Sequence, residues 1–288
     1  MNAYFFKKLK TLTLMCVLFT VALTGCSVKK EEAADPIQEE PASMPVIVMT
    51  DEEPEPAVEA EESDPYEESD FAEEETEEIK GYIAIDAGHQ KKGNSGKEPL
   101  GPGSNEMKAK VSGGTTGVAT GIPEYELNLQ VALKLRDELE ERGYRVLMIR
   151  ETNDVDISNS ERAQMANDAG VDALIRIHAN GSEDPSVNGA MTICQTPKNP
   201  YNADLYEESR ALSEKVLDAF AATTGARKEK IWETDSMTGI NWCRTPVTII
   251  EMGYMSNPDE DRRMSSEDYQ VKMVQGMADG IDAYIEGR

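Results

Sequence analysis

The sequence predicts one α/β domain, built on a mostly parallel, twisted sheet with helices on both faces. Two observations support this prediction. Residues 81–288 number roughly two hundred, the size of a single α/β domain. Within them, short apolar runs alternate with amphipathic helical stretches, which is the pattern of strands joined by crossover helices. The preceding residues differ in composition, so we predict a signal peptide over 1–25 and a disordered acidic linker over 26–80.

Residues 1–25 have the composition of an export signal. A basic start is followed by an apolar run from Thr11 to Leu23, which is too short for a comfortable membrane span. The run closes with Leu23-Thr24-Gly25-Cys26, which resembles the lipobox of bacterial lipoproteins, where the chain is cut before the Cys and lipid is attached to it. We therefore expect a lipid anchor at Cys26 and an extracytoplasmic location. An ordinary secretory signal or an uncleaved anchor are the alternatives, and both would also export the protein.

The linker is crowded with Glu and Asp and has few large apolar residues. Runs such as Glu73 to Glu78 repel themselves and cannot bury enough surface to fold, so we expect a solvated spacer. The linker supplies most of the chain's formal charge of -26. The remaining domain is still acidic, which argues against a nucleic-acid partner and against simple electrostatic adhesion to an anionic membrane or wall polymer.

Apolar runs predict the strands of the domain. Residues 172–180 are apolar over most of their length, interrupted by Arg176, and indicate a buried strand. Residues 246–251 are rich in β-branched side chains, which favour strands. The predicted strands are 82–86, 144–150, 172–180, 189–194 and 246–251.

Four-residue spacing and capping signals predict the helices. Apolar side chains recur every four residues from Leu127 to Leu139 on one helix face, and Gly143 ends that helix. The segment Ser158 to Glu161 has the capping-box form that opens a helix, and Gly170 ends it. The predicted helices are 126–142, 158–169, 205–223, 259–264 and 269–285.

The segment from Gln90 to Pro123 is too long to be a plain connector. It is rich in Gly, Ser, Lys and Asn. Loops of this length in compact domains are usually lids or binding loops, and a disordered insertion is the alternative.

The chain has two histidines, and each lies just past an apolar strand-like run. His89 ends the run from Tyr82, and His178 lies near the end of the run from Asp172. Sites in open α/β sheets are built at the carboxyl ends of strands, and imidazole is the commonest metal ligand. We therefore interpret the two histidines as one shared site, although two unrelated imidazoles are the alternative.

Two histidines suit an open metal site that adds one carboxylate and keeps a position for water. Glu124, where the long loop enters the first helix, is the best candidate, and Glu126 is its rival. A carboxylate at a helix start is also favoured by the helix dipole without any metal. Residue spacing alone leaves this choice open.

Glu251 ends the last apolar strand, where burying an unpaired carboxylate is costly. Such a group is placed to act as a general base with a raised pKa. The alternative is a buried salt bridge to Arg176 or Arg244. In the same domain we expect two unpaired thiols at Cys194 and Cys243, and a disulfide between them is the alternative.

Five motifs resemble those of the zinc-dependent N-acetylmuramoyl-L-alanine amidases of the amidase_3 type, and they follow one another along the chain in the same order as in that family. The histidine motifs are I-A-I-D-A-G-H at 83–89 and I-H-A-N at 177–180. E-Y-E-L-N-L at 124–129 resembles the family's E-x-x-L-N-L helix start, and 158–167 resembles its E-R-x-x-x-A-N helix. I-I-E-M-G-Y-M-S-N at 249–257 resembles V-E-x-G-F-x-S-N.

The resemblance implies a site and an activity. It assigns His89, Glu124 and His178 as ligands of Zn²⁺, choosing Glu124 over Glu126, and Glu251 as the catalytic carboxylate. The implied reaction is hydrolysis of the amide bond between N-acetylmuramic acid and L-alanine in peptidoglycan. The partners would be peptidoglycan and the membrane, the latter through lipidated Cys26, and we expect a monomer.

Two other functions remain open at this point. One is a wall-binding lipoprotein whose site is non-catalytic or occluded by the 90–123 loop, which is longer than in compact members of the family. The other is a zinc peptidase of another kind. Trp242, ahead of the last strand, is equally suited to the core or to a cleft lining.

Overall fold

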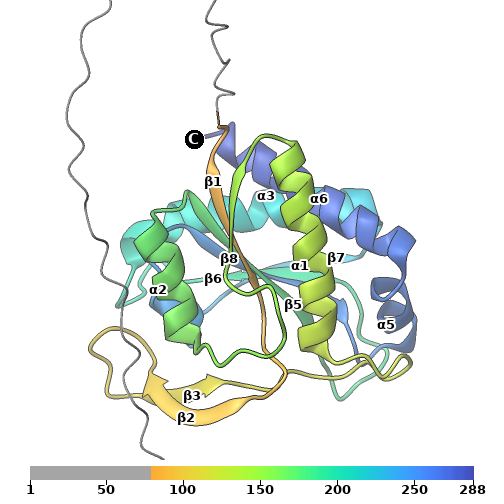
Figure 1. The fold of residues 1–288 in the computed structure, drawn as a ribbon, viewed down its shortest axis with the longest axis horizontal. Helices are drawn as coiled ribbons and strands as arrows, with labels where there is room; N and C mark the ends of the chain where they lie inside the picture. The colour runs from red at the N-terminus through yellow and green to blue at the C-terminus, as the bar shows by residue number, and fades with distance from the viewer. Residues whose placement is uncertain (1–78) are drawn as a thin grey trace, which may run out of the picture. The chain divides into compact units, whose positions relative to one another are not determined.

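The computed structural model describes residues 79–288, and a mixed sheet of six strands is the centre of that part of the chain (Figure 1). The order is β4-β1-β5-β8-β6-β7. Neighbouring strands are parallel except β6 and β8, which are antiparallel. The predicted mostly parallel sheet is therefore confirmed. The strands are β1 (Tyr82–Ala87), β4 (Arg145–Met148), β5 (Ala173–Asn180), β6 (Ala190–Cys194), β7 (Lys228–Glu233) and β8 (Val247–Tyr254).

Helices cover both faces of the sheet, as the sequence predicts. One apolar cluster joins the sheet to α1, α3 and α6, and a second joins it to α2 and α4. The capping box at Ser158 is present, and Gly170 ends α2 in the left-handed conformation. The helices are α1 (Glu124–Glu141), α2 (Asn159–Ala169), α3 (Tyr206–Thr224), α4 (Thr238–Asn241), α5 (Pro258–Met264) and α6 (Glu267–Ile285), with a 3₁₀ turn η1 (Ala203–Leu205).

The alternation of side chains along β5 decides what lies on each face. Ile175 and Ile177 pack in the cluster with α1 and α6. Leu174 packs in the other cluster, and Arg176 and His178 follow it at two-residue intervals. Because successive side chains of a strand point to opposite faces, Arg176 and His178 share the face that α2 and α4 cover. Arg176 and His178 therefore point from the sheet toward the layer that contains α2 and α4.

The long loop contains a hairpin that the sequence does not predict, formed by β2 (Asn94–Pro99) and β3 (Met107–Val111). Figure 1 shows this hairpin beside one end of α2. Side-chain hydrogen bonds hold it there, including Asn159 Nδ2 to the carbonyl of Lys110 and Trp242 Nε1 to the carbonyl of Pro99. The alternative of a disordered insertion is therefore wrong.

Two smaller predictions have clear outcomes. Cys194 and Cys243 are both free and buried, which confirms two unpaired thiols. Trp242 packs at the edge of a core cluster. The edge strand β7 is not among the predicted strands, because four of its six residues are charged. The predicted signal peptide, the predicted lipid attachment at Cys26 and almost all of the predicted acidic linker lie outside the described residues.

No helix among residues 79–288 is long and apolar enough to cross a membrane.

Candidate metal centre

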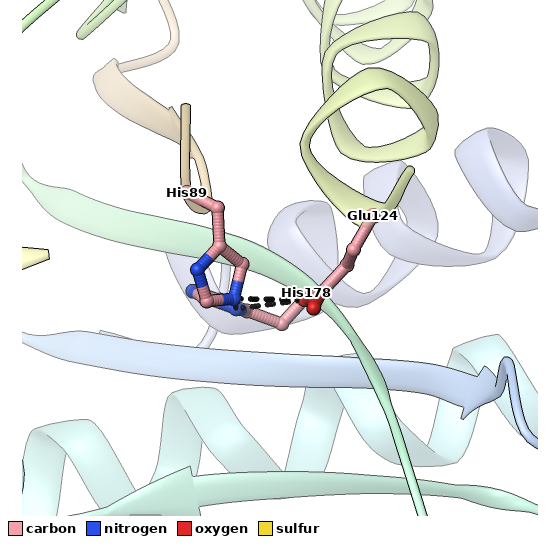
Figure 2. A group of neighbouring side chains, drawn as sticks. All are labelled: His89, Glu124 and His178. Carbon is pink, nitrogen blue, oxygen red and sulfur yellow. Dashed lines mark hydrogen bonds and ion pairs between the residues drawn. The ribbon is translucent and has the colours of Figure 1, made fainter. Parts of the chain in front are cut away.

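Three side chains from three different elements converge at the carboxyl edge of the sheet. His89 follows β1, His178 lies near the end of β5, and Glu124 is the first residue of α1. Figure 2 shows all three pointing toward one another. His89 Nε2 lies 3.1 Å from Glu124 Oε1, His178 Nδ1 lies 3.2 Å from the same oxygen, and the two nitrogens are 3.2 Å apart.

These separations fit a tetrahedral metal ion. Ligand atoms about 2.0–2.1 Å from a tetrahedral zinc lie roughly 3.3 Å from one another. Two imidazoles and one carboxylate are also a donor set that zinc uses in open, catalytic sites. Of the two candidate carboxylates, Glu124 lies with the two histidines, and Glu126 is not part of this group. The residues present therefore fit a zinc ion with a further coordination position for water.

Buried arginines fix the backbone that carries His89. This residue has a left-handed backbone, with φ at 61°, which is uncommon for a residue with a side chain. Arg162 Nη2 donates to the carbonyl of His89, and Arg150 donates to the carbonyls of Ala87 and Gly88. These bonds hold the turn after β1 in the conformation that aims the imidazole at the other ligands.

The imidazole of His89 is also oriented by a hydrogen bond. Its Nδ1 lies 3.0 Å from the carbonyl oxygen of Ser112 and 3.1 Å from the hydroxyl of the same residue. A carbonyl oxygen can only accept, so Nδ1 carries the proton and Nε2 presents its lone pair to a metal. The segment after β3 thus sets the tautomer of one ligand.

Backbone amides hold the carboxylate of Glu124. Oε2 accepts from the N–H of Thr115, and Oε1 accepts from the N–H of Ala179. Gly114 has a positive φ, and a β-carbon there would lie 2.9 Å from Oε2, so this glycine makes room for the carboxylate. Burial raises the pKa of Glu124, but the adjacent imidazoles of His178 and His89 outweigh burial and hold the pKa well below its usual range.

His178 is packed tightly against the turn after β1. A β-carbon on Gly88 would lie 2.3 Å from the imidazole, so no larger residue fits there without movement. Burial lowers the pKa of His178 to about 4, although a hydrogen bond that the Glu124 carboxylate accepts from the imidazole acts in the opposite direction. The imidazole is therefore neutral at physiological pH, which is the form that binds a metal.

Glu251 lies on β8, in register with His178 on β5. Its Oε2 atom is buried and has no hydrogen-bond partner among residues 79–288. The alternative of a salt bridge to Arg176 or Arg244 is wrong, because Arg176 pairs with Asp86 and Arg244 donates to the carbonyl of Tyr201. Burial, together with the nearby Glu124 carboxylate, raises the pKa of Glu251 to about 8.

Three supporting residues are not identified from the sequence, namely Asp86, Arg150 and Arg162. Asp86 is fully buried in β1 and pairs with Arg162 at 2.6 Å and with Arg176 at 2.8 Å. Both arginines hold its pKa far below the usual range, although burial acts in the opposite direction. A charged residue inside an apolar strand run was the available signal, as for Arg176, but its partners are distant in the sequence.

Residues 83–283 match the Amidase_3 protein family, described as N-acetylmuramoyl-L-alanine amidase. The chain is 27% identical over 167 residues to the N-acetylmuramoyl-L-alanine amidase LytC of Bacillus subtilis, covering 58% of this chain and 32% of LytC. It thus spans about a third of the length of that relative.

Two solved structures are similar over almost their whole length. The crystal structure of the N-acetylmuramyl-L-alanine amidase Ami1 from Mycobacterium smegmatis is 25% identical, with a TM-score of 0.65, covering 72% of this chain and 98% of that one. The catalytic domain of CwlV, an N-acetylmuramoyl-L-alanine amidase from Bacillus (Paenibacillus) polymyxa var. colistinus, is 25% identical, with a TM-score of 0.58. It covers 72% of this chain and 99% of the CwlV domain.

Proposed function

This chain belongs to the Amidase_3 family of N-acetylmuramoyl-L-alanine amidases, and we propose that it is a zinc-dependent member that acts on peptidoglycan. The reaction is hydrolysis of the amide bond between N-acetylmuramic acid and L-alanine. The observation that carries the proposal is the mutual distance of 3.1–3.2 Å between one donor atom each of His89, Glu124 and His178. These three residues would hold the zinc ion.

The residues divide the chemistry between them. Bound zinc would supply electrophilic activation of the attacking water and of the scissile carbonyl. Glu251 takes the proton of the water as general base and passes it to the leaving amine of L-alanine as general acid. Its buried oxygen without a partner and its raised pKa support this role, because a carboxyl group with a pKa near neutrality both accepts and returns a proton.

The proposed setting follows from the chain before the domain. We infer that the protein is exported as a lipoprotein, anchored through Cys26, and that the acidic linker lets the domain reach the wall as a monomer. The partners are then peptidoglycan and the membrane, without nucleic acid. The zinc site and the substrate are both compatible with an extracytoplasmic location.

Metal analysis and product analysis test the proposal together. The purified protein should contain about one zinc per chain and release stem peptides from purified wall, leaving free N-terminal L-alanine and intact glycan. The variant His178→Ala should lose both zinc and release, because it removes one of three protein ligands. Cleavage between other residues would indicate a different zinc peptidase, and the absence of any release would favour a non-catalytic or loop-occluded wall-binding protein.

A further inference from the structure

A small cavity opens directly beside the metal ligands, on the sheet face that α2 and α4 cover. It measures about 150 Å³. His89 and His178 form one wall, and Arg176, Asn159 and Gly239 lie around the rest. A volume of that size holds about five water molecules, or a group no larger than a carboxylate with its neighbouring carbon atoms.

Arg176 points an unpaired donor into this cavity. The side chain is buried, with 3% of the residue exposed. Its Nε donates to Asp86 Oδ2 at 2.8 Å, and its Nη2 donates to Asn159 Oδ1 at 2.8 Å. Nη1 has no hydrogen-bond partner in the described part of the chain, although a guanidinium donates through all three nitrogens. Nη1 is not fully enclosed by the described residues, so this free cationic donor can be reached from the cavity that Arg176 lines.

Arg176 shares its carboxylate partner with a second arginine. Asp86 is the carboxylate that faces Arg176, and it also pairs with Arg162 at 2.6 Å. Two guanidinium groups therefore share this one carboxylate, so Asp86 alone does not neutralise both. Asn159, the other partner of Arg176, is neutral. An incoming anion would satisfy the unpaired donor.

Gly239, in another part of the cavity lining, leaves room for Nη1 of Arg176. A β-carbon built on Gly239 would lie only 1.6 Å from this nitrogen. Any other residue at position 239 would displace the guanidinium. Gly239 is thus part of the site, because the guanidinium occupies the space that a side chain would take.

We propose that Arg176 binds a free carboxylate on the peptide side of the scissile bond, close to the L-alanine that is released. This inference rests on the proposed amidase function and deepens it. The glycan side offers hydroxyl and acetamido groups but no carboxylate, since the lactyl carboxyl is the one in the amide. A cavity of this volume is about 7 Å across, which is the length of roughly two extended residues. The carboxylate therefore belongs to the residue that follows L-alanine.

Two synthetic muramoyl peptides test the inference. They differ only in a free carboxylate or a carboxamide on the residue after L-alanine, and every other carboxyl group is blocked. The zinc-loaded full-length protein should cleave the carboxylate form with a kcat/KM about 10- to 100-fold higher, as a charge-assisted hydrogen bond predicts. Both Arg176→Met and Gly239→Ala should remove this preference, while Arg244→Met, which removes an exposed arginine outside the cavity, should keep it.

Binding of the corresponding released peptides, measured by calorimetry, separates this inference from the proposed function. A preference for the carboxylate peptide that needs Arg176 supports the inference even if no turnover is seen. Equal binding of both peptides by the wild type overturns it. An equal loss of kcat for both substrates in Arg176→Met, with thermal unfolding unchanged, also overturns it, because the guanidinium would then act on the reacting carbonyl instead.

Discussion

The turn after β1 and the strand pair β5–β8 both build the site, but they differ in how completely their polar side-chain atoms are hydrogen-bonded. At the turn, Arg162 donates through all three nitrogens, to acceptors that include the carbonyls of Ile157 and His89. On the strand pair, Oε2 of Glu251 is buried without a partner, and Nη1 of Arg176 is unpaired within residues 79–288.

The difference separates residues that hold the proposed metal ligands in place from residues that we propose to transfer a proton or contact the substrate. Hydrogen bonds that are complete in the folded chain hold a ligand in place before metal or substrate arrives. A buried polar atom that lacks a partner destabilises the fold, and such atoms are concentrated where a site gains from them. We therefore expect substitutions on the strand pair to change turnover, and substitutions at the turn to change stability and metal affinity.

The largest effect is expected for Glu251→Gln. The amide cannot accept the proton of the attacking water, so kcat should fall by about 10²- to 10⁴-fold, as for loss of a general base. Zinc content should stay at the wild-type level, since the three proposed ligands are unchanged. Release of stem peptide and metal analysis on the same preparation are the measurements. Wild-type turnover in this variant would show that Glu251 takes no part in the reaction. The proposed distinction between a positioning turn and a reactive strand pair would then be wrong.

The sequence predicts the site better than it predicts its surroundings, for a physical reason. His89 and His178 end apolar runs, and Glu124 begins an amphipathic helix, so local patterns place them, and the motif resemblance supplies their roles. The hairpin β2–β3 has no such local pattern, because tertiary bonds such as that from Trp242 to Pro99 hold it. The charge of Asp86 is visible in its strand, but its arginine partners are 76 and 90 residues away.

The next largest effect tests the other region. Arg162→Met should lower the free energy of unfolding by about 3–5 kcal/mol, because it removes one partner of a fully buried ion pair. Asp86 keeps Arg176, so the fold should persist at reduced stability. Chemical denaturation of the zinc-free protein is the measurement. The control is Arg244→Met, at an exposed position, which should change stability by no more than about 0.5 kcal/mol.

A pH series measures how much the unpaired carboxyl group of Glu251 lowers the free energy of unfolding when it ionises. The pKa of Glu251 is raised from 4.5 to about 8 in the folded protein, so the folded chain binds this proton more tightly than the unfolded chain. The free energy of unfolding of the zinc-free protein should therefore fall as pH rises from 4.5 to 8, relative to Glu251→Gln. Allowing for relaxation, we expect a difference of about 2–4 kcal/mol across that range.

The denaturation series uses wild type and Glu251→Gln side by side, so that groups common to both cancel. His178 is one such group, since its lowered pKa gives a slope of the opposite sign at acidic pH. Parallel curves for the two proteins would mean that the carboxyl group of Glu251 already has a partner when folded. The polar side chains of the strand pair β5–β8 would then be as fully hydrogen-bonded at Glu251 as those of the turn after β1.

The smallest effect is expected for Ser112→Ala, in the segment after β3 that contacts His89 of the well-bonded turn. The hydroxyl of Ser112 lies 3.1 Å from His89 Nδ1, but the backbone carbonyl of the same residue lies closer, at 3.0 Å, and survives the substitution. Loss of an orienting partner of a histidine ligand typically costs 10- to 100-fold in metal affinity. Because the carbonyl remains, we expect a loss of less than about threefold in a zinc competition assay. A loss of tenfold or more would show that the hydroxyl orients the imidazole, and that positioning here depends on a side chain rather than on the backbone.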